Sequence, residues 1–259
     1  MKAVILAGGF GTRISEESAL RPKPMVEIGG LPILWHIMKY FSCFGVKEFI
    51  ICLGYKSYMI KEYFNNYFLH QSDVTINLED GSKQIHSNYS ENWKVSLIDT
   101  GLNTMTGGRL KRIRNYLSDQ PFYMTYGDGV SNVNLADLLD THFRSNKLVT
   151  VTAVQPSGRF GSLNISSDDT VKSFIEKPKG DGSWINGGFF VIDPKALDYV
   201  DGDHTVWEDA PLINLAKDSQ LHAFKHRDFW HPMDTLRDKN YLHDLVSQNK
   251  APWMIWQSS

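Results

Sequence analysis

Blocks of apolar and polar residues alternate along the first hundred positions. A short apolar run at 3–6 predicts a buried strand, and apolar residues at helical spacing over 31–44 predict a helix. The run at 47–53 predicts another buried strand, and apolar positions between 59 and 67 predict a second helix. This alternation is typical of a doubly wound, largely parallel sheet. In such sheets ligands bind beyond the carboxyl ends of the strands.

The rest of the chain is richer in predicted strands. Strands are predicted at 74–78, 95–98, 122–126, 149–154, 163–165, 171–175 and 189–192, and helices at 108–117 and 235–246. The polar stretch 80–92 is expected to leave the sheet. These patterns predict an α/β fold: a Rossmann-like mixed, mostly parallel sheet flanked by helices, with a smaller β-rich portion. No linker or repeat divides residues 1–259, so we expect one domain.

Composition narrows the possible classes of protein. Hydrophobic residues make up 42% and charged residues 22%, which is ordinary for a domain with a core of its own. The 27 basic and 29 acidic residues give a net charge of −2, which argues against a nucleic-acid binder. We expect a cytoplasmic protein, because neither a leader nor an apolar run of membrane-spanning length is evident. Cys43 and Cys52 are predicted to be buried thiols.

A glycine-rich loop follows the first predicted strand. Gly8, Gly9 and Gly11 precede Thr12 and Arg13. Glycines let backbone N–H groups come close to a ligand, and an arginine offers a fork of donors to phosphate oxygens. The loop therefore suits a polyanion, although an ordinary turn with a surface arginine remains the alternative.

Neither of two familiar phosphate-binding patterns fits this loop. The third glycine of a dinucleotide fingerprint is missing, and no Gly-Lys-Ser/Thr of a Walker loop occurs. This disfavours a dinucleotide-dependent oxidoreductase. Lys23 lies between Pro22 and Pro24, whose rings stiffen the chain, so its cation is expected to be held in place.

Two aspartates are candidate metal ligands. Asp128 lies between Gly127 and Gly129 at the carboxyl end of a predicted strand, and a carboxylate there suits Mg²⁺. A turn aspartate is the alternative. Asp234 precedes the last predicted helix, as its N-cap or as a second metal ligand.

Other candidates also leave two interpretations open. Thr104, Thr106, Gly107 and Gly108 lie at the N-terminus of the predicted helix at 108–117. Free N–H groups there favour an anion or a polar ring, and the alternative is a threonine that caps the helix. Trp253 and Trp256 could pack on a neighbouring subunit or on their own chain. Four histidines lack metal-ligand spacing and are interpreted as structural: His36, His142, His231 and His243.

The segment from Leu6 to Arg13, together with Lys23, resembles the sugar-nucleotide pyrophosphorylases, the nucleotidyltransferases that join a nucleoside triphosphate to a sugar 1-phosphate. The resemblance implies that Arg13, Lys23 and Asp128 are catalytic and that Asp128 and Asp234 bind Mg²⁺. It implies a nucleotide site of Leu6, Ala7, Gly8, Gly9, Phe10, Gly11, Thr12, Arg13, Lys23, Thr104, Arg109 and Gly127. It implies sugar-phosphate contacts from Glu176, Lys179, Asn186 and Gly187, which a surface ion pair and a tight turn would also explain.

The resemblance also implies which part of the chain binds each substrate, and which reaction the chain catalyses. Nucleotide binding falls to about 1–130, and sugar binding to about 131–259. The motifs at 104–109, 176–182, 185–191 and 230–237 resemble the members of the family that use CTP and glucose 1-phosphate to make CDP-glucose, a precursor of dideoxyhexoses in bacterial O-antigens. The choice of CTP rests on this likeness alone. A homo-oligomer, with a hexamer as the candidate state, is implied as well.

In the implied reaction the sugar phosphate attacks the α-phosphorus in line. Arg13 neutralises the leaving pyrophosphate and Lys23 contacts the phosphates. The alternatives are a uridylyl- or thymidylyltransferase acting on a hexose 1-phosphate, and a regulatory homologue that binds nucleotide without turnover.

Overall fold

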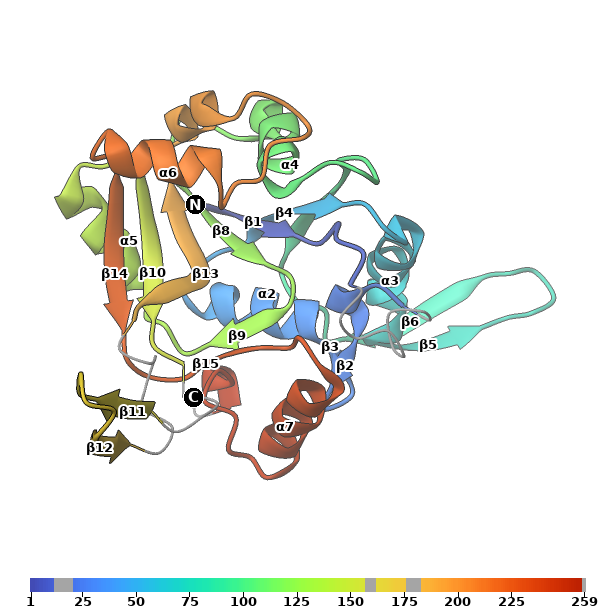
Figure 1. Ribbon diagram of the computed structural model, residues 1–259. Helices are drawn as coiled ribbons and strands as arrows, with labels where there is room; N and C mark the ends of the chain where they lie inside the picture. Colours follow the sequence, from blue (N-terminus) through green and yellow to red (C-terminus); the bar gives the residue numbers. More distant parts are fainter. Residues whose placement is uncertain (12–20, 157–161, 176–182, 258–259) are drawn as a thin grey trace.

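The computed structural model describes residues 1–11, 21–156, 162–175 and 183–257 (Figure 1). The chain folds around one seven-stranded sheet. In spatial order its strands are β14 (Leu221–His226), β10 (Val149–Val154), β13 (Ile185–Ile192), β8 (Phe122–Tyr126), β1 (Lys2–Leu6), β4 (Glu48–Leu53) and β7 (Lys94–Asp99). Strand β13 is antiparallel to both neighbours, and the other adjacent pairs are parallel. This confirms the predicted mixed, mostly parallel sheet.

The central strands of the sheet, β8, β1 and β4, are buried on both faces. Along β1, Ala3 and Ile5 join one apolar cluster, while Val4 and Leu6 join another on the opposite face, because successive side chains of a strand point to opposite sides. The first cluster contains residues of α2 (Ile33–Cys43), α3 (Ser57–His70), α5 (Leu135–Ser145) and α7 (Leu236–Ser247). The second contains residues of α4 (Thr106–Arg112), α6 (Ala210–Lys217) and the 3₁₀ helix η4 (Pro194–Tyr199).

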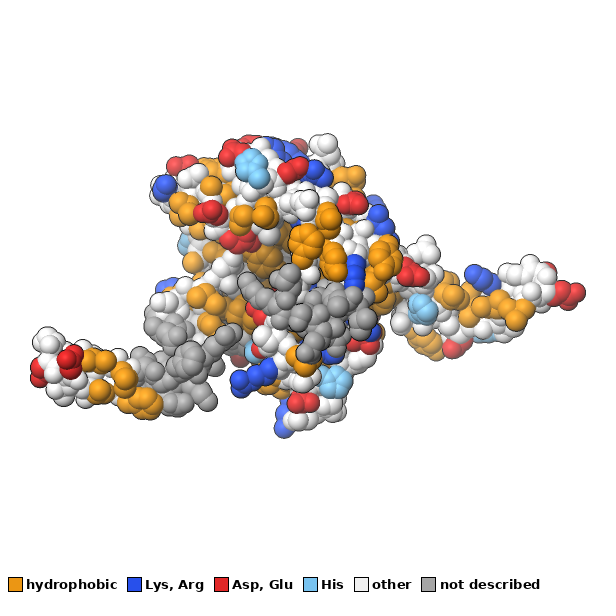
Figure 2. All heavy atoms as spheres, turned by 45° about the vertical axis from the view of Figure 1, so that its right-hand side comes forward, with side chains coloured by type: hydrophobic (Ala, Val, Ile, Leu, Met, Phe, Trp, Pro, Cys, Tyr) orange, Lys and Arg blue, Asp and Glu red, His pale blue; other side chains and the backbone are white. Residues whose placement is uncertain are grey.

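Two hairpins project from this body (Figures 1 and 2). One pairs β5 (Ser72–Ile76) with β6 (Lys83–Asn88), so the polar stretch 80–92 leaves the main sheet as predicted. The other pairs β11 (Ser162–Ile165) with β12 (Val171–Ile175). The rest of the predicted strand-rich block belongs to the main sheet.

Several element predictions need correction. Helix α4 ends at Arg112, and the expected continuation to 117 is a separate 3₁₀ turn, η2 (Arg114–Tyr116), which keeps Leu117 against the apolar cluster. The elements α5, α6 and β14 were not among those predicted. Strand β14 is hard to detect because it lies at the edge of the sheet and its sequence, Leu-His-Ala-Phe-Lys-His, has no regular alternation of apolar and polar residues.

The single-residue predictions outside the site have mixed outcomes. Cys52 is buried as expected, but Cys43 is exposed because it is the last residue of α2. Trp253 packs on its own chain: it stacks on Phe229 and donates from Nε1 to Nδ1 of His36. Within the described segments, no helix has both the length and the apolar character needed to cross a membrane.

Three of the other histidines also make structural contacts. His142 Nδ1 lies 3.1 Å from Thr150 Oγ1, and His231 Nε2 lies 3.1 Å from Asp238 Oδ1. His243 Nδ1 accepts from the backbone of Gly29.

Candidate functional site

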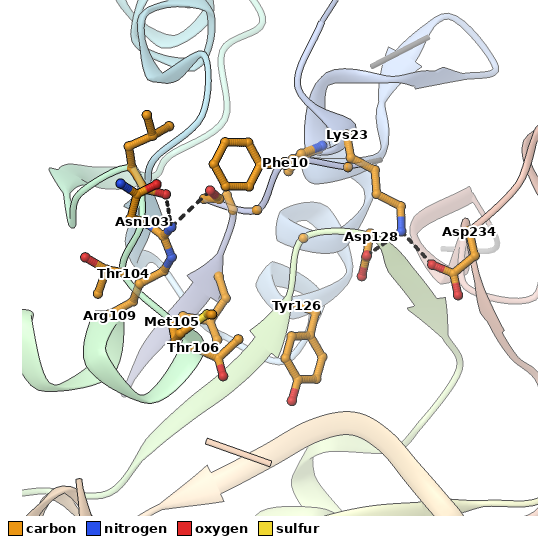
Figure 3. Close-up of a pocket in the computed structure, with 18 residues that line it drawn as sticks. Phe10, Lys23, Asn103, Thr104, Met105, Thr106, Arg109, Tyr126, Asp128 and Asp234 are labelled. Carbon is orange, nitrogen blue, oxygen red and sulfur yellow. Dashed lines mark hydrogen bonds and ion pairs between the residues drawn. The ribbon is translucent and has the colours of Figure 1, made fainter. Parts of the chain in front are cut away.

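A cavity of about 540 Å³ opens at the carboxyl ends of β1 and β8 (Figure 3). It is bordered by the glycine-rich loop, the short 3₁₀ helix η1 (Lys23–Met25), the segment before α4 and the turn after β8. The predicted site residues that line it are Leu6, Ala7, Gly8, Gly9, Phe10, Gly11, Lys23, Thr104, Arg109, Gly127, Asp128 and Asp234. The predicted residues Thr12, Arg13, Glu176 and Lys179 lie outside the described part of the chain.

Pairing of two short strands brings the two aspartates together. Strand β9 (Gly129–Ser131) pairs antiparallel with β15 (Trp230–Pro232), so that Gly129 lies opposite Pro232. The backbone N–H of Met233 donates to the carbonyl of Asp128 at 2.7 Å. Asp128 and Asp234, hereafter the carboxylate pair, flank this ladder and are thereby held beside each other.

Lys23 contacts the carboxylate pair on the same side of the cavity (Figure 3). Its Nζ lies 2.6 Å from Asp128 Oδ2 and 2.7 Å from Asp234 Oδ1 (Figure 3). Only 10% of the lysine side chain is exposed, against 33% and 29% for the aspartates. Burial lowers the pKa of Lys23, but the attraction and hydrogen bonds of both carboxylates outweigh burial and leave the pKa above its ordinary value. Lys23 is therefore a charged ammonium in this site.

The prolines around Lys23 shape its turn as expected. Pro22 is the N-cap of η1, and its carbonyl accepts from the N–H of Met25 at 2.8 Å, while the Lys23 carbonyl accepts from Val26 at 3.1 Å. Pro24 packs beside Gly127, where an added Cβ would lie 3.0 Å from the proline ring. The backbone of Lys23 is fixed in this way, and only its side chain has rotational freedom.

The alternative role of Asp234 as a helix cap is wrong. Helix α7 has Thr235 as its N-cap, in a capping box with Asp238. The side chain of Asp234 therefore faces the cavity and Lys23 instead of capping α7.

Arg109 braces the glycine-rich loop from the opposite wall. Its side chain is buried, and its guanidinium donates at 2.8–3.3 Å to the carbonyls of Gly8, Leu53, Gly101 and Leu102 and to Thr100 Oγ1. An added Cβ on Gly8 would lie only 2.2 Å from this guanidinium. Arg109 lines the cavity, and its contact with nucleotide stays a prediction.

At the start of α4 the structure favours close packing as the reason for the glycines. An added Cβ on Gly107 would lie 2.8 Å from the carbonyl oxygen of Thr205, and one on Gly108 would lie 2.6 Å from backbone atoms of Asp203. The N–H of Gly108 donates to Thr205. The N-cap is Met105 without a side-chain cap bond, so the alternative of a threonine cap is wrong.

Comparison with known proteins agrees with this geometry. A family model described as nucleotidyl transferase matches residues 2–235. The chain belongs to the nucleotidyl transferase family. It is 56% identical over 258 residues to the glucose-1-phosphate cytidylyltransferase of Salmonella typhi, an alignment that covers 99% of this chain and 100% of that protein. It is 43% identical over 257 residues to the probable glucose-1-phosphate cytidylyltransferase of Bacillus subtilis, with coverage of 99% and 100%.

A solved structure shows the same architecture. HddC from Yersinia pseudotuberculosis superposes with a TM-score of 0.69 at 26% sequence identity, over 95% of this chain and 99% of that chain. Nucleotidyl transferases of this family generally use a divalent metal ion. Within the described ranges no cluster of three or more His, Cys, Asp or Glu side chains forms a metal site. The carboxylate pair, which opens on the cavity, supplies the hard oxygen ligands that such an ion prefers.

The sequence analysis of this nucleotidyl transferase predicted no site role for the cavity-lining residues Leu102, Asn103, Met105 and Tyr126, nor for Glu208. Tyr126, the last residue of β8, lines the cavity and donates from its hydroxyl to the carboxylate of Glu208. Thr106 Oγ1 donates to the same carboxylate at 2.6 Å, so Glu208 ties two walls of the cavity together. Burial and the nearby Glu208 charge raise the pKa of Tyr126. Its place just before Gly127 could have identified Tyr126, but Glu208 has no local signal.

The predicted sugar residues Asn186 and Gly187 lie next to the cavity wall. Neither is in a tight turn, because both belong to β13, whose pairing with β10 is irregular at this point. Asn186 Oδ1 accepts from the Gly188 N–H at 2.8 Å, and the Gly187 carbonyl accepts from Trp230 Nε1 at 2.6 Å. The Asn186 side chain also acts on the Tyr126 hydroxyl, whose pKa it lowers against the larger effects of burial and Glu208. An added Cβ on Gly187 would lie 2.8 Å from Val154, so this glycine also serves packing.

Proposed function

We propose that this chain transfers a cytidylyl group from CTP to α-D-glucose 1-phosphate, yielding CDP-glucose and pyrophosphate. The family implies nucleotide and sugar-phosphate substrates. Over 99% of this chain, a relative at 56% identity carries the name glucose-1-phosphate cytidylyltransferase and one at 43% identity the name probable glucose-1-phosphate cytidylyltransferase. The observation that supports catalysis best is the meeting of Lys23 with the carboxylate pair in one cavity with the glycine-rich loop.

The reaction depends more on neutralising negative charge than on a general base. A phosphate oxygen of glucose 1-phosphate attacks the α-phosphorus, and the bond to the β-phosphate oxygen breaks as pyrophosphate leaves in line. The attacking group is already an anion, so repulsion between two polyanions is the main obstacle. We assign Lys23 and Arg13 to the phosphates, and backbone N–H groups of Gly8, Gly9 and Gly11 to the triphosphate. Such preorganised charges lower the barrier by about 3–4 kcal/mol each.

Mg²⁺ is the proposed ion of the carboxylate pair. Two carboxylates with phosphate oxygens and water make a suitable ligand set for it. When bound, the ion neutralises charge that develops on the phosphates. The protein's own part is to hold Asp128 and Asp234 together through the β9–β15 ladder.

The remaining assignments follow the two parts of the chain. Thr104, Arg109 and residues 6–13 would serve the nucleotide within about 1–130. Glu176, Lys179, Asn186 and Gly187 would serve the sugar phosphate within about 131–259. The influence of Asn186 on the hydroxyl of Tyr126, which lines the cavity, supports a sugar pocket beside the triphosphate.

The reaction is tested by pyrophosphate release from purified protein with Mg²⁺. The panel consists of CTP, UTP, dTTP and GTP, each with glucose, mannose and galactose 1-phosphate. We expect release with CTP and glucose 1-phosphate. Release with UTP or dTTP but not CTP would assign a uridylyl- or thymidylyltransferase, and nucleotide binding without any release would assign a regulatory homologue.

We further propose that the protein is a cytoplasmic homo-oligomer, with a hexamer as the candidate state, that serves O-antigen synthesis. Exposed apolar side chains on both hairpins support association, because such patches mark interaction surfaces (Figure 2). These side chains are Ile76, Ile85, Leu163, Ile165, Val171 and Phe174. Light scattering on the purified protein would give the number of subunits, and a monomer would contradict this proposal.

A further inference from the structure

The ammonium of Lys23 occupies the position that a divalent ion would need. It donates to one oxygen of each member of the carboxylate pair, at 2.6 and 2.7 Å. An ion of the size of Mg²⁺ bound by the same two oxygens would lie about 2.0–2.1 Å from each. Both cations cannot sit between these oxygens at once, because they would overlap and repel.

The surroundings allow the lysine to leave without disturbing the fold. Its backbone is held by the η1 turn and by Pro22 and Pro24, whereas its side chain has four rotatable bonds and also lines the cavity. The aspartates are about three times as exposed as the lysine, so they can be reached from the cavity. The glycine-rich loop, proposed to hold phosphates, borders the same space.

We propose that the Lys23 ammonium takes the place of the metal ion between the two carboxylates while the ion is absent, and that it exchanges with the ion when the ion binds. While the ammonium lies between Asp128 and Asp234, it offsets their repulsion and keeps them at the spacing of a metal site. Arrival of the ion with the triphosphate drives Nζ from the carboxylates to the phosphate oxygens. Metal and nucleotide therefore bind cooperatively, because the phosphates accept the cation that the metal displaces.

The exchange predicts that removal of the ammonium strengthens binding of the metal ion in the absence of nucleotide. Lys23→Met keeps the length of the side chain without its charge. Binding of Mn²⁺ without nucleotide, followed by electron paramagnetic resonance, should be about tenfold tighter in Lys23→Met than in the unaltered protein. The matched control is Lys39→Met, which breaks the 2.6 Å pair of Lys39 with Glu91 and should bind Mn²⁺ as the unaltered protein does.

Equal or weaker Mn²⁺ binding in Lys23→Met would overturn the exchange and leave Lys23 as a fixed part of the site. Circular dichroism melts before the titration check that the variant is folded. Lys23→Gln, which keeps a neutral donor, replaces it if Lys23→Met does not melt cooperatively, with the same expected gain.

This inference rests on the proposed function for the purpose of the ion, but the two can fail separately. If the unaltered protein releases pyrophosphate and Lys23→Met shows no gain in Mn²⁺ affinity, the exchange fails and the function stands. If no combination of nucleotide and sugar phosphate in the panel gives turnover, but Lys23→Met binds Mn²⁺ more tightly, the exchange stands and the proposed function fails.

Discussion

At the scale of single residues, Gly8 and Gly9 are neighbours with opposite surroundings. A Cβ on Gly8 would lie 2.2 Å from the guanidinium of Arg109, whereas a Cβ on Gly9 would meet nothing within 4 Å. Arg109 cannot yield, because its guanidinium donates to five oxygens at the end of β4 and in the surrounding loops. The two glycines of one motif therefore serve different purposes.

Gly8→Ala should lower the free energy of unfolding by about 1–3 kcal/mol, as for an overpacked site. Gly9→Ala should change it by less than about 0.5 kcal/mol. Urea unfolding of both variants measures the difference. Equal losses in the two variants would show that Arg109 does not pack against Gly8 in this way.

Replacement of one carboxylate tests the metal site at the same scale. Asp128→Asn keeps the shape of the side chain but removes the charge, and we expect turnover to fall by about 10²–10³, by analogy with loss of one preorganised polar group. Initial rates of pyrophosphate release measure this. Asp198→Asn, at an exposed ion pair with Arg114, is the control and should leave the rate unchanged. Unchanged turnover in Asp128→Asn would remove Asp128 from the proposed chemistry.

At the scale of elements, the cap of α7 fixes the chain directly after Asp234. Thr235 and Asp238 form a capping box there, and Asn134, six residues after Asp128, caps α5 with its side chain. Both caps accept backbone N–H donors at a helix start. Only the first is adjacent to a proposed catalytic group.

Thr235→Ala and Asn134→Ala should each lower the free energy of unfolding by about 1 kcal/mol. Only Thr235→Ala should also lower turnover, because the capping box of α7 fixes the chain next to Asp234 and so orients its side chain. Denaturant unfolding and steady-state rates of both variants separate the two effects. A loss of turnover in Asn134→Ala as well would mean that helix stability alone governs the rate.

At the scale of the whole molecule, His36 connects the turn at Ile28 to the C-terminal segment of the chain. Its Nε2 lies 2.9 Å from the Ile28 carbonyl, and its Nδ1 accepts from Trp253 near the C-terminus. Burial lowers the pKa of His36 from 6.5 to about 4, although the hydrogen bond to Ile28 acts in the opposite direction. The folded protein therefore keeps this imidazole neutral under conditions in which the unfolded chain protonates it.

Between pH 6.5 and about 4 the unfolded state binds the additional proton, so stability falls as the pH is lowered. The full contribution of His36 across this interval is about 3 kcal/mol. His36→Gln keeps a donor toward Ile28 and does not titrate, so its unfolding free energy should vary less over this interval. Urea titrations at several pH values measure the slope, and identical slopes in both proteins would contradict the assignment.

Local pattern was enough for the fold class and for half of the site. Strand β1, helix α2 and strand β4 have periodic apolar residues, because burial on one or both faces leaves a mark on neighbouring positions. The glycine-rich loop and Lys23 could also be predicted from neighbouring positions. Glycine gives the backbone its freedom and proline its stiffness, and both effects are visible in adjacent residues of the sequence.

Tertiary structure alone decided which distant groups meet. The β9–β15 pairing sets Asp128 beside Asp234, and the order of the main sheet brings Arg109 to Gly8 and Glu208 to Tyr126. These partners are separated by 82 residues or more, and the chain between them carries no local mark of the contact. Residue type determined which chemistry each group could perform, whereas non-local strand pairing determined which groups could perform it together.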